Sequence, residues 1–155
     1  MKSVRTCHAL LQVRGMFSHH PMQIRIAALA DYTNVTDSGK LNILGIFSQI
    51  HAASVPAVHP LMQFVVQFAF DPVETGDKQI RIVLQDEDAR ELLAMEGHLN
   101  IPKPNTADPV VVNQILVLQN VVFPHFGNYE FVIEVDGETI PANIPLDILP
   151  SPTPS

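Results

Sequence analysis

Residues 127–145 read G-N-Y-E-F-V-I-E-V-D-G-E-T-I-P-A-N-I-P, and this stretch decides the fold. Its first half alternates apolar with polar side chains, which is the period of a β-strand with one face buried and one in water. The apolar residues of that strand are Tyr129, Phe131, Ile133 and Val135. Asp136 and Gly137 follow, and an Asp-Gly pair tolerates the positive φ angles of a type I′ turn. The stretch therefore predicts a β-hairpin.

The return strand of this hairpin continues the alternation as far as Ile148. Its apolar residues are Ile140, Ala142, Ile144, Leu146 and Ile148. Pro141 and Pro145 stand between them, and proline has no N–H to donate to a strand ladder. We therefore expect this strand to lie at a sheet edge or to pair only in part. Because an isolated hairpin is marginally stable in water, the rest of the chain must supply more sheet.

The composition is that of one globular domain. The chain has 155 residues, of which 46% are hydrophobic and 16% are charged. This length allows one sizeable core, and the composition is far from that of disordered chains. Thirteen prolines and 7 glycines, with few runs of helix-forming residues, favour short strands joined by turns.

The charge of the chain is uneven. The formal net charge is −7, yet residues 1–21 hold three of the nine basic residues and none of the sixteen acidic ones. Six basic residues thus stand against sixteen acidic ones in the remainder, a difference of −10. A surface of that sign repels phosphate backbones, so we expect no nucleic-acid partner. There is also no run of 18 apolar residues, so we expect no membrane partner.

We divide the chain into three parts. Residues 1–21 are expected to be a disordered extension or an over-extended start, because their apolar run is too short and interrupted for a signal peptide. Residues 22–149 are expected to form one β-sandwich domain, and the Pro/Ser-rich residues 150–155 a disordered tail. The single cysteine, Cys7, has no intramolecular partner, which favours a reducing, cytoplasmic home.

The rest of the domain is a series of further strands. Alternation or β-branching predicts them at 23–32, 41–51, 62–70, 79–85, 91–101 and 110–123. Residues 86–97 could instead form a short helix, but we favour an acidic hairpin turn at 86–90. The polar pairs in 110–123 predict a bulge there. With the final hairpin this gives about eight strands, which predicts an all-β, antiparallel β-sandwich, immunoglobulin-like or C2-like.

The strand at 41–51 is apolar on both sides and has Gly45 in its middle. Such a strand is central, or one of its faces meets another subunit. Leu44, Ile46 and Ile50 are therefore candidates for a face that binds a second copy or an unknown protein. The interpretation that we favour is that the opposite sheet or a loop covers them. Gly45 predicts a bulge or a close approach of another group to the backbone.

Gly127-x-Tyr129-x-Phe131 resembles the G-x-Y-x-C pattern of immunoglobulin-type domains, with Phe131 where the disulfide cysteine stands. The resemblance implies that the Tyr129 hydroxyl bonds back to the main chain in a tyrosine corner. The chain has neither the disulfide nor any tryptophan, so the resemblance is one of architecture.

A resemblance to one family covers residues 24–148. It rests on A-L-A-D-Y at 28–32, L-N-I-L-G at 41–45, D-E-D-A-R at 86–90 and G-N-Y-E-F-V-I-E-V-D-G-E at 127–138. Together these resemble an uncharacterised bacterial family, the domain of unknown function numbered 6941. The motifs are turns and core residues. The resemblance therefore implies a compact bacterial β-sandwich and assigns no active site.

Two kinds of residue could bind a metal ion. His51, His59, His98 and His125 lack the short spacing of zinc sites, and we expect no metal or other cofactor on them. The acidic run at 86–88 could bind Ca²⁺ through Asp86 and Asp88, provided that other loops bring further carboxylates. The carboxylates available for this are Asp71, Asp77 and Asp108. We favour a solvated turn.

No residue pattern indicates catalysis. There is no G-x-S-x-G motif, no phosphate-binding glycine loop and no nucleophile with a nearby base in the sequence. We therefore expect a non-catalytic binding or structural module, with no catalytic or cofactor-binding residues. The alternative is a Ca²⁺-dependent ligand-binding domain centred on Asp86 and Asp88. An enzyme is the least supported class, although the fold would permit one.

Overall fold

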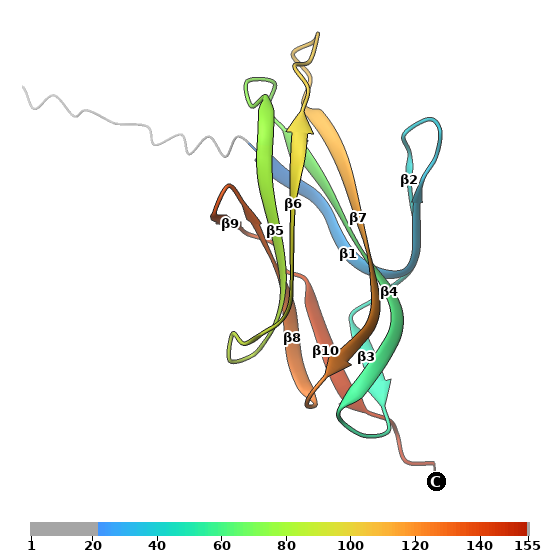
Figure 1. Ribbon diagram of the computed structural model, residues 1–155. Helices are drawn as coiled ribbons and strands as arrows, with labels where there is room; N and C mark the ends of the chain where they lie inside the picture. Colours follow the sequence, from blue (N-terminus) through green and yellow to red (C-terminus); the bar gives the residue numbers. More distant parts are fainter. Residues whose placement is uncertain (1–21, 155) are drawn as a thin grey trace, which may run out of the picture.

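A computed structural model describes residues 22–154 of the chain. Within this range there is no helix, and ten strands form two sheets (Figure 1). The all-β prediction is therefore confirmed. The predicted N-terminal extension, residues 1–21, lies outside the described residues, as does Ser155.

The first sheet has four strands in the order β2-β1-β4-β7, and all its neighbours are antiparallel. Its strands are β1 (Met22–Val35), β2 (Leu41–Phe47), β4 (Ala57–Phe70) and β7 (Val110–Phe123). The second sheet has six strands, in the order β3-β10-β8-β5-β6 with β9 beside β8. Its strands are β3 (Gln49–Ala52), β5 (Gly76–Asp86), β6 (Glu91–Ile101), β8 (Gly127–Val135), β9 (Glu138–Ile140) and β10 (Pro145–Pro150). Only β3 and β10 pair in parallel.

The predicted hairpin is present. Val135 of β8 pairs with Glu138 of β9, and the two residues between them, Asp136 and Gly137, have φ angles of 51° and 82°. Both positive angles are those that a type I′ turn requires. The alternate apolar residues of β8 are buried, from Tyr129 at 2% exposed to Val135 at 7%.

The return strand is broken where the prolines predict weak pairing. It consists of β9 and β10, separated by residues 141–144. The expectation of partial pairing is confirmed. The alternative, an edge position, is wrong, because β10 lies between β8 and β3. β10 extends to Pro150, and the Ser151 N–H donates to the Ala52 carbonyl over 2.9 Å, while 151–154 have no regular structure.

The single strand predicted at 41–51 is two strands in different sheets. The chain leaves the four-stranded sheet after Phe47 and enters the six-stranded sheet at Gln49. Two edge strands thus produce the pattern that we interpreted as one central strand. The close approach predicted at Gly45 is present: its φ is 68°, and a Cβ there would collide with the Asp31 carboxylate.

The middle of the chain follows the prediction more closely. β6 spans Glu91–Ile101, and a turn rather than a helix connects it to β5. β4 begins at Ala57, before the start of the strand predicted at 62–70. The bulge predicted in 110–123 is wrong, because the register of β7 with β4 keeps one offset along its whole length. Asn120 instead adopts a left-handed φ of 52° within the strand.

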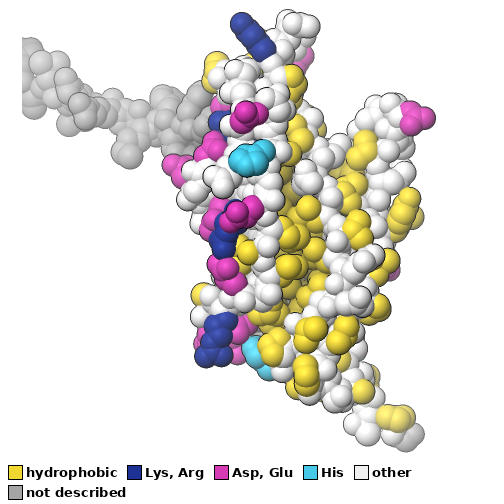
Figure 2. Space-filling model, viewed as in Figure 1, with side chains coloured by type: hydrophobic (Ala, Val, Ile, Leu, Met, Phe, Trp, Pro, Cys, Tyr) yellow, Lys and Arg dark blue, Asp and Glu magenta, His cyan; other side chains and the backbone are white. Residues whose placement is uncertain are grey.

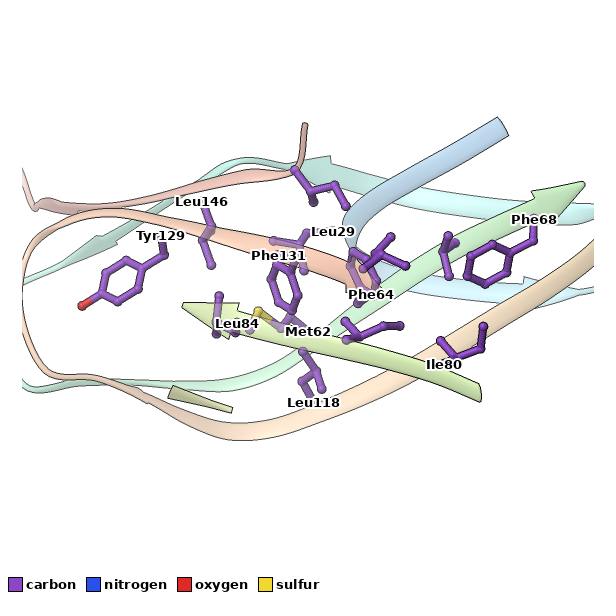
Figure 3. Packing of buried hydrophobic residues seen from close by; sticks show 14 of the residues in the cluster. Leu29, Met62, Phe64, Phe68, Ile80, Leu84, Leu118, Tyr129, Phe131 and Leu146 are labelled. Carbon is purple, nitrogen blue, oxygen red and sulfur yellow. The ribbon is translucent and has the colours of Figure 1, made fainter. Parts of the chain in front are cut away.

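The core lies between the two sheets (Figure 3). At its centre Phe64 of β4 stacks on Phe131 of β8, with ring centroids 4.7 Å apart and planes 8° from parallel. Both side chains are buried, and so are Leu29, Met62 and Leu146 near them. Phe131, at the position where the immunoglobulin pattern has cysteine, thus joins the sheets through an aromatic contact instead of a disulfide.

Candidate functional site

The outer face of the four-stranded sheet is the most unusual surface of the described chain. In β4 the residues Met62, Phe64 and Val66 point into the core and are fully buried. Side chains alternate along a strand, so Leu61, Gln63 and Val65 belong to the outer face, where Leu61 is 46% exposed but Gln63 is 9% and Val65 0% exposed. Residues directly opposite each other on antiparallel strands share a face. The register of β4 with its neighbours therefore identifies the outward residues of the whole sheet.

These outward residues form rows across the strands. One row crosses all four strands and consists of Ile46, Ala30, Gln63 and Val117. The next rows consist of Ala28, Val65 and Ile115, then of Ile26, Gln67 and Asn113. Leu61 pairs with Gln119, and Tyr32 with Leu44. None of these residues is charged, and we call this set the uncharged face.

Several members of the uncharged face are large, apolar and exposed. Ile46 is 66% exposed, Leu44 60% and Val117 55%, and Tyr32 and Leu61 are each close to half exposed. The charged residues of β1 in this region are Arg25 and Asp31. Arg25 lies at a register shift between β1 and β4, and Asp31 is not among the residues of β1 that pair with β2. Neither residue therefore belongs to the rows of the uncharged face.

Three of the four amide side chains of the face, those of Gln63, Gln67 and Asn113, are hydrogen-bonded within the chain. The Gln67 Nε2 donates to Asn113 Oδ1 over 2.8 Å, between β4 and β7. The Oε1 of Gln63 accepts both from the N–H and from the hydroxyl of Thr33, each at 2.6 Å. Because these groups already have partners, they add little polarity to the face.

The outer face of the six-stranded sheet has the opposite character. Arg81 of β5 lies between Glu91 and Glu96 on one side and Glu134 on the other, at 2.7, 3.5 and 3.3 Å. Figure 2 shows charged side chains gathered along β6 and apolar ones toward β7. In a sheet with one face in water, apolar residues that point inward ordinarily alternate along each strand with polar residues that point outward. The four-stranded sheet lacks that charge, and contiguous exposed apolar surface marks interaction sites.

The structure brings together two of the three predicted interface residues. Leu44 and Ile46 lie on the uncharged face, so the interpretation that another element covers them is wrong. Ile50 lies on β3 in the other sheet and packs against the core. Tyr32, Leu61 and Val117 were missed. The absence of charge from both 61–69 and 110–123 is the signal that could have indicated them.

The predicted Ca²⁺ loop has its own internal partners. The Asp86 Oδ1 accepts from the N–H groups of Asp88 and Arg90, each at 2.9 Å, and its side chain is 3% exposed. The Arg90 N–H, followed by the His125 and Asp88 hydrogen bonds, holds the pKa of Asp86 below its usual value against the effect of burial. Asp86 thus closes the β5–β6 turn.

The other carboxylates expected at this loop lie elsewhere. Asp77 and Asp86 stand near opposite ends of β5, which for a strand of this length means roughly 30 Å apart. Asp71 and Asp108 flank the pair Phe70–Val110, at the end of the molecule where β5 begins. Among residues 22–154, no three His, Cys, Asp or Glu side chains form a group that could hold a metal ion. Ca²⁺ binding at Asp86 and Asp88 stays the alternative hypothesis, and the solvated turn the one that we favour.

The four described histidines do not gather at one place. His51 Nδ1 lies 3.5 Å from the Pro150 carbonyl, His59 packs against Phe47 with ring centroids 5.8 Å apart, and His98 lies on β6. His125 lies in the connection between β7 and β8, stacked on Tyr129. His51 and His59 line the same pocket beside the β3–β4 connection, whereas His98 and His125 lie apart from them.

His125 is held between two acceptors. Its Nδ1 lies 2.9 Å from the Phe126 carbonyl oxygen and its Nε2 3.3 Å from Asp86 Oδ2. A neutral imidazole has one N–H, so only the protonated ring can donate to both. The Phe126 carbonyl, and after it the Asp86 carboxylate, raises the pKa of His125 above its ordinary value.

Stability is expected to decrease as the pH rises through the pKa of His125. A group whose pKa is raised by folding stabilises the protein fully below its unfolded value, about 6.5, and loses that contribution as the pH passes the folded value. Urea unfolding should therefore show a lower midpoint at about pH 8 than at about pH 6. The variant His125→Gln should flatten this dependence of the midpoint on pH. His51, His59 and His98 are unchanged in it, so the difference from the wild type reports on His125. An unchanged slope in the variant would contradict the assignment.

No helix that could span a bilayer occurs in the described part of the chain. A family model described as a family of unknown function, DUF6941, matches residues 25–149. None of the curated proteins matches the sequence. One similar solved structure is that of the Pseudomonas fluorescens alkylpurine DNA glycosylase AlkC bound to DNA containing an abasic site analog, at 6% identity and a TM-score of 0.44. That likeness covers 83% of this chain and 30% of the glycosylase chain.

Proposed function

We propose that this chain, which belongs to the DUF6941 family of unknown function, is a non-catalytic β-sandwich module that binds other proteins through its uncharged face. The observation that carries the proposal is the complete lack of charged residues in the rows that cross β2, β1, β4 and β7. The chain is otherwise acidic, with a formal net charge of −7. A protein that keeps its charge off one sheet face leaves that face able to lose its water on binding.

The apolar side chains of the face support binding energetically. Leu44, Ile46 and Val117 each expose more than half of their surface. Covering apolar surface contributes about 25 cal/mol for each Å² removed from water. The amides of Gln63 and Gln67 already have hydrogen-bond partners, so their burial leaves fewer unpaired groups. The face is thus suited to protein, and its lack of Lys and Arg disfavours nucleic acid.

For the architecture we propose an immunoglobulin-like rather than a C2-like sandwich. The Tyr129 hydroxyl donates to the His125 carbonyl over 2.8 Å and accepts from the His125 N–H over 3.3 Å. These bonds lie where the chain passes from β7 in one sheet to β8 in the other, which is the place of a tyrosine corner. A cytoplasmic location, favoured by the lone Cys7, is part of the same proposal.

The test is to place charge on the face. The double variant Leu44→Asp and Ile46→Asp should lower the recovery of a bound protein partner by about 10-fold or more in quantitative affinity purification from the native cell. Val73→Asp is the matched control, because Val73 is 81% exposed in a turn outside the face. The control should recover the same partner as the wild type.

The fold is checked in the same preparations by thermal melting. The variant should melt close to the wild type, since Leu44 and Ile46 are exposed on an edge strand. Equal recovery of the same proteins by the wild type, the double variant and the control would overturn the proposed function, because recovery would then not depend on the face.

A further inference from the structure

The edge strand β7 lacks the features that normally protect a sheet edge. It spans 14 residues, V-V-V-N-Q-I-L-V-L-Q-N-V-V-F, and contains no charged residue, no proline and no glycine. Its one side pairs with β4, and its other side has no paired strand in the described chain. A long edge without charged residues or proline is a template on which a further strand can pair.

The other three edges of the described sheets are less open to pairing. β3 has four residues, and β2 has seven with Gly45 in a left-handed conformation. β6 carries Glu91 and Glu96. Short length, backbone irregularity and charge are the usual ways in which proteins discourage edge pairing. Of the four edge strands, β7 alone is long and uncharged, and its backbone is regular along most of its length.

We propose that β7 pairs with β7 of a second copy of this chain, antiparallel and about a two-fold axis at Leu116. This inference rests on the proposed function, since it joins two uncharged faces into one sheet of eight strands. In this register Leu116 meets Leu116, Ile115 meets Val117, and Asn113 meets Gln119. Closed two-fold dimers are the commonest protein assemblies, and their interface must be complementary to itself.

The side chains of β7 select this register. On its outward side the strand reads Val111, Asn113, Ile115, Val117 and Gln119. With the axis at Leu116, Ile115 meets Val117 and each amide meets an amide. With the axis at Val117, Ile115 would face Gln119. Asn113 uses its Oδ1 to accept from Gln67, which leaves its amide N–H groups to donate to Gln119 of the second copy.

The apolar surface beside β7 also favours a second copy of this chain as the partner. A groove runs between β6 and β7 and is lined by Leu92, Met95 and Leu118, with Leu99 and Leu116 farther along (Figure 2). A two-fold axis at Leu116 turns the two grooves toward each other, so that each copy covers the apolar side chains of the other. The contact also brings no like charges together at the strand, although each chain is acidic.

The test uses the full chain in native mass spectrometry and sedimentation equilibrium at micromolar concentration. The wild type should be a dimer. Val117→Asp places a carboxylate opposite Ile115 twice, by symmetry, and should weaken the dimer about 100-fold or more. Val117 is 55% exposed, so the variant is expected to remain folded.

The double variant Ile115→Lys and Val117→Asp tests the register. With the axis at Leu116, each new lysine faces a new aspartate across the axis, and the dimer should return. A monomeric wild type, a Val117→Asp variant that stays dimeric, or a double variant that stays monomeric would each overturn the inference.

The same measurement on Leu44→Asp separates this inference from the proposed function. Leu44 lies on β2, at the opposite edge of the sheet from β7, so the dimer should persist in that variant while partner recovery falls. If the wild type proves monomeric but partner recovery still depends on Leu44 and Ile46, the pairing through β7 fails and the proposed function stands.

Discussion

Replacing Phe131 with alanine is expected to lower the free energy of unfolding by about 3 to 5 kcal/mol. Phe131 is 1% exposed and stacks on Phe64 of the facing sheet, so its removal leaves a cavity at the only aromatic stack between the sheets in the described core. The loss of buried apolar atoms and the cavity that remains both lower the free energy of unfolding. Urea unfolding monitored by circular dichroism measures the change.

Two controls place the effect at this contact. Val58→Ala removes apolar volume from a residue that is 58% exposed and should change stability by less than about 0.5 kcal/mol. The losses from Phe64→Ala and Phe131→Ala should not add in the double variant, because the two rings contact each other. Full additivity, or a loss below about 1 kcal/mol for Phe131→Ala, would show that the stack does not hold the sheets together.

Tyr129→Phe is expected to cost about 1 to 3 kcal/mol, because it leaves the part-buried N–H and carbonyl groups of His125 without their partner. The hydroxyl that it removes both donates to the His125 carbonyl and accepts from the His125 N–H, and the ring beneath it is 2% exposed. The shape of the side chain is otherwise retained. The same urea experiment measures the loss.

Tyr32→Phe is the matched control, since Tyr32 is 50% exposed on the uncharged face. Its stability should stay within about 0.5 kcal/mol of the wild type. If both substitutions had the same small effect, the hydroxyl of Tyr129 would not stabilise the corner between β7 and β8, and the support for an immunoglobulin-like architecture would be lost.

The parts of the fold that the sequence predicts are those in which pairing is local. The β8–β9 hairpin depends on the alternation from Tyr129 to Val135 and on the Asp136–Gly137 turn, all within neighbouring residues. The β5–β6 hairpin is similar: Asp86 closes its turn by accepting from main-chain N–H groups two and four residues later. Short-range chemistry of this kind is visible in the sequence itself.

Sheet membership is not local, and here the prediction failed. The run 41–51 has apolar residues on both sides because it serves two sheets, with the change of sheet at Ser48 between β2 and β3. Similarly, the pairs Asn113-Gln114 and Gln119-Asn120 predict a bulge that is not present. Asn113 in fact bonds Gln67 on β4, and Asn120 adopts a left-handed conformation. Both explanations require the neighbouring strand.

The candidate site shows the same division. Leu44 and Ile46 could be identified from an apolar strand with no polar side. Leu61 and Val117 join them only through the register of β4 with β7, which brings residues from separate strands into one face. The alternative of a Ca²⁺ site at Asp86 and Asp88 needed carboxylates from other loops, and the length of β5 separates Asp77 from Asp86.

The parallel pair of β3 and β10 has a consequence for the order in which the protein can fold. Gln49 pairs with Asp147, about 100 positions later in the chain, and β10 also covers the free side of β8. On the ribosome, β3 must therefore wait for its partner until residues 145–150 emerge from the exit tunnel. Pairings of such long range fold slowly, in milliseconds to seconds. During that interval nascent chains expose unpaired strands, and chaperones that bind extended apolar segments have their opportunity then.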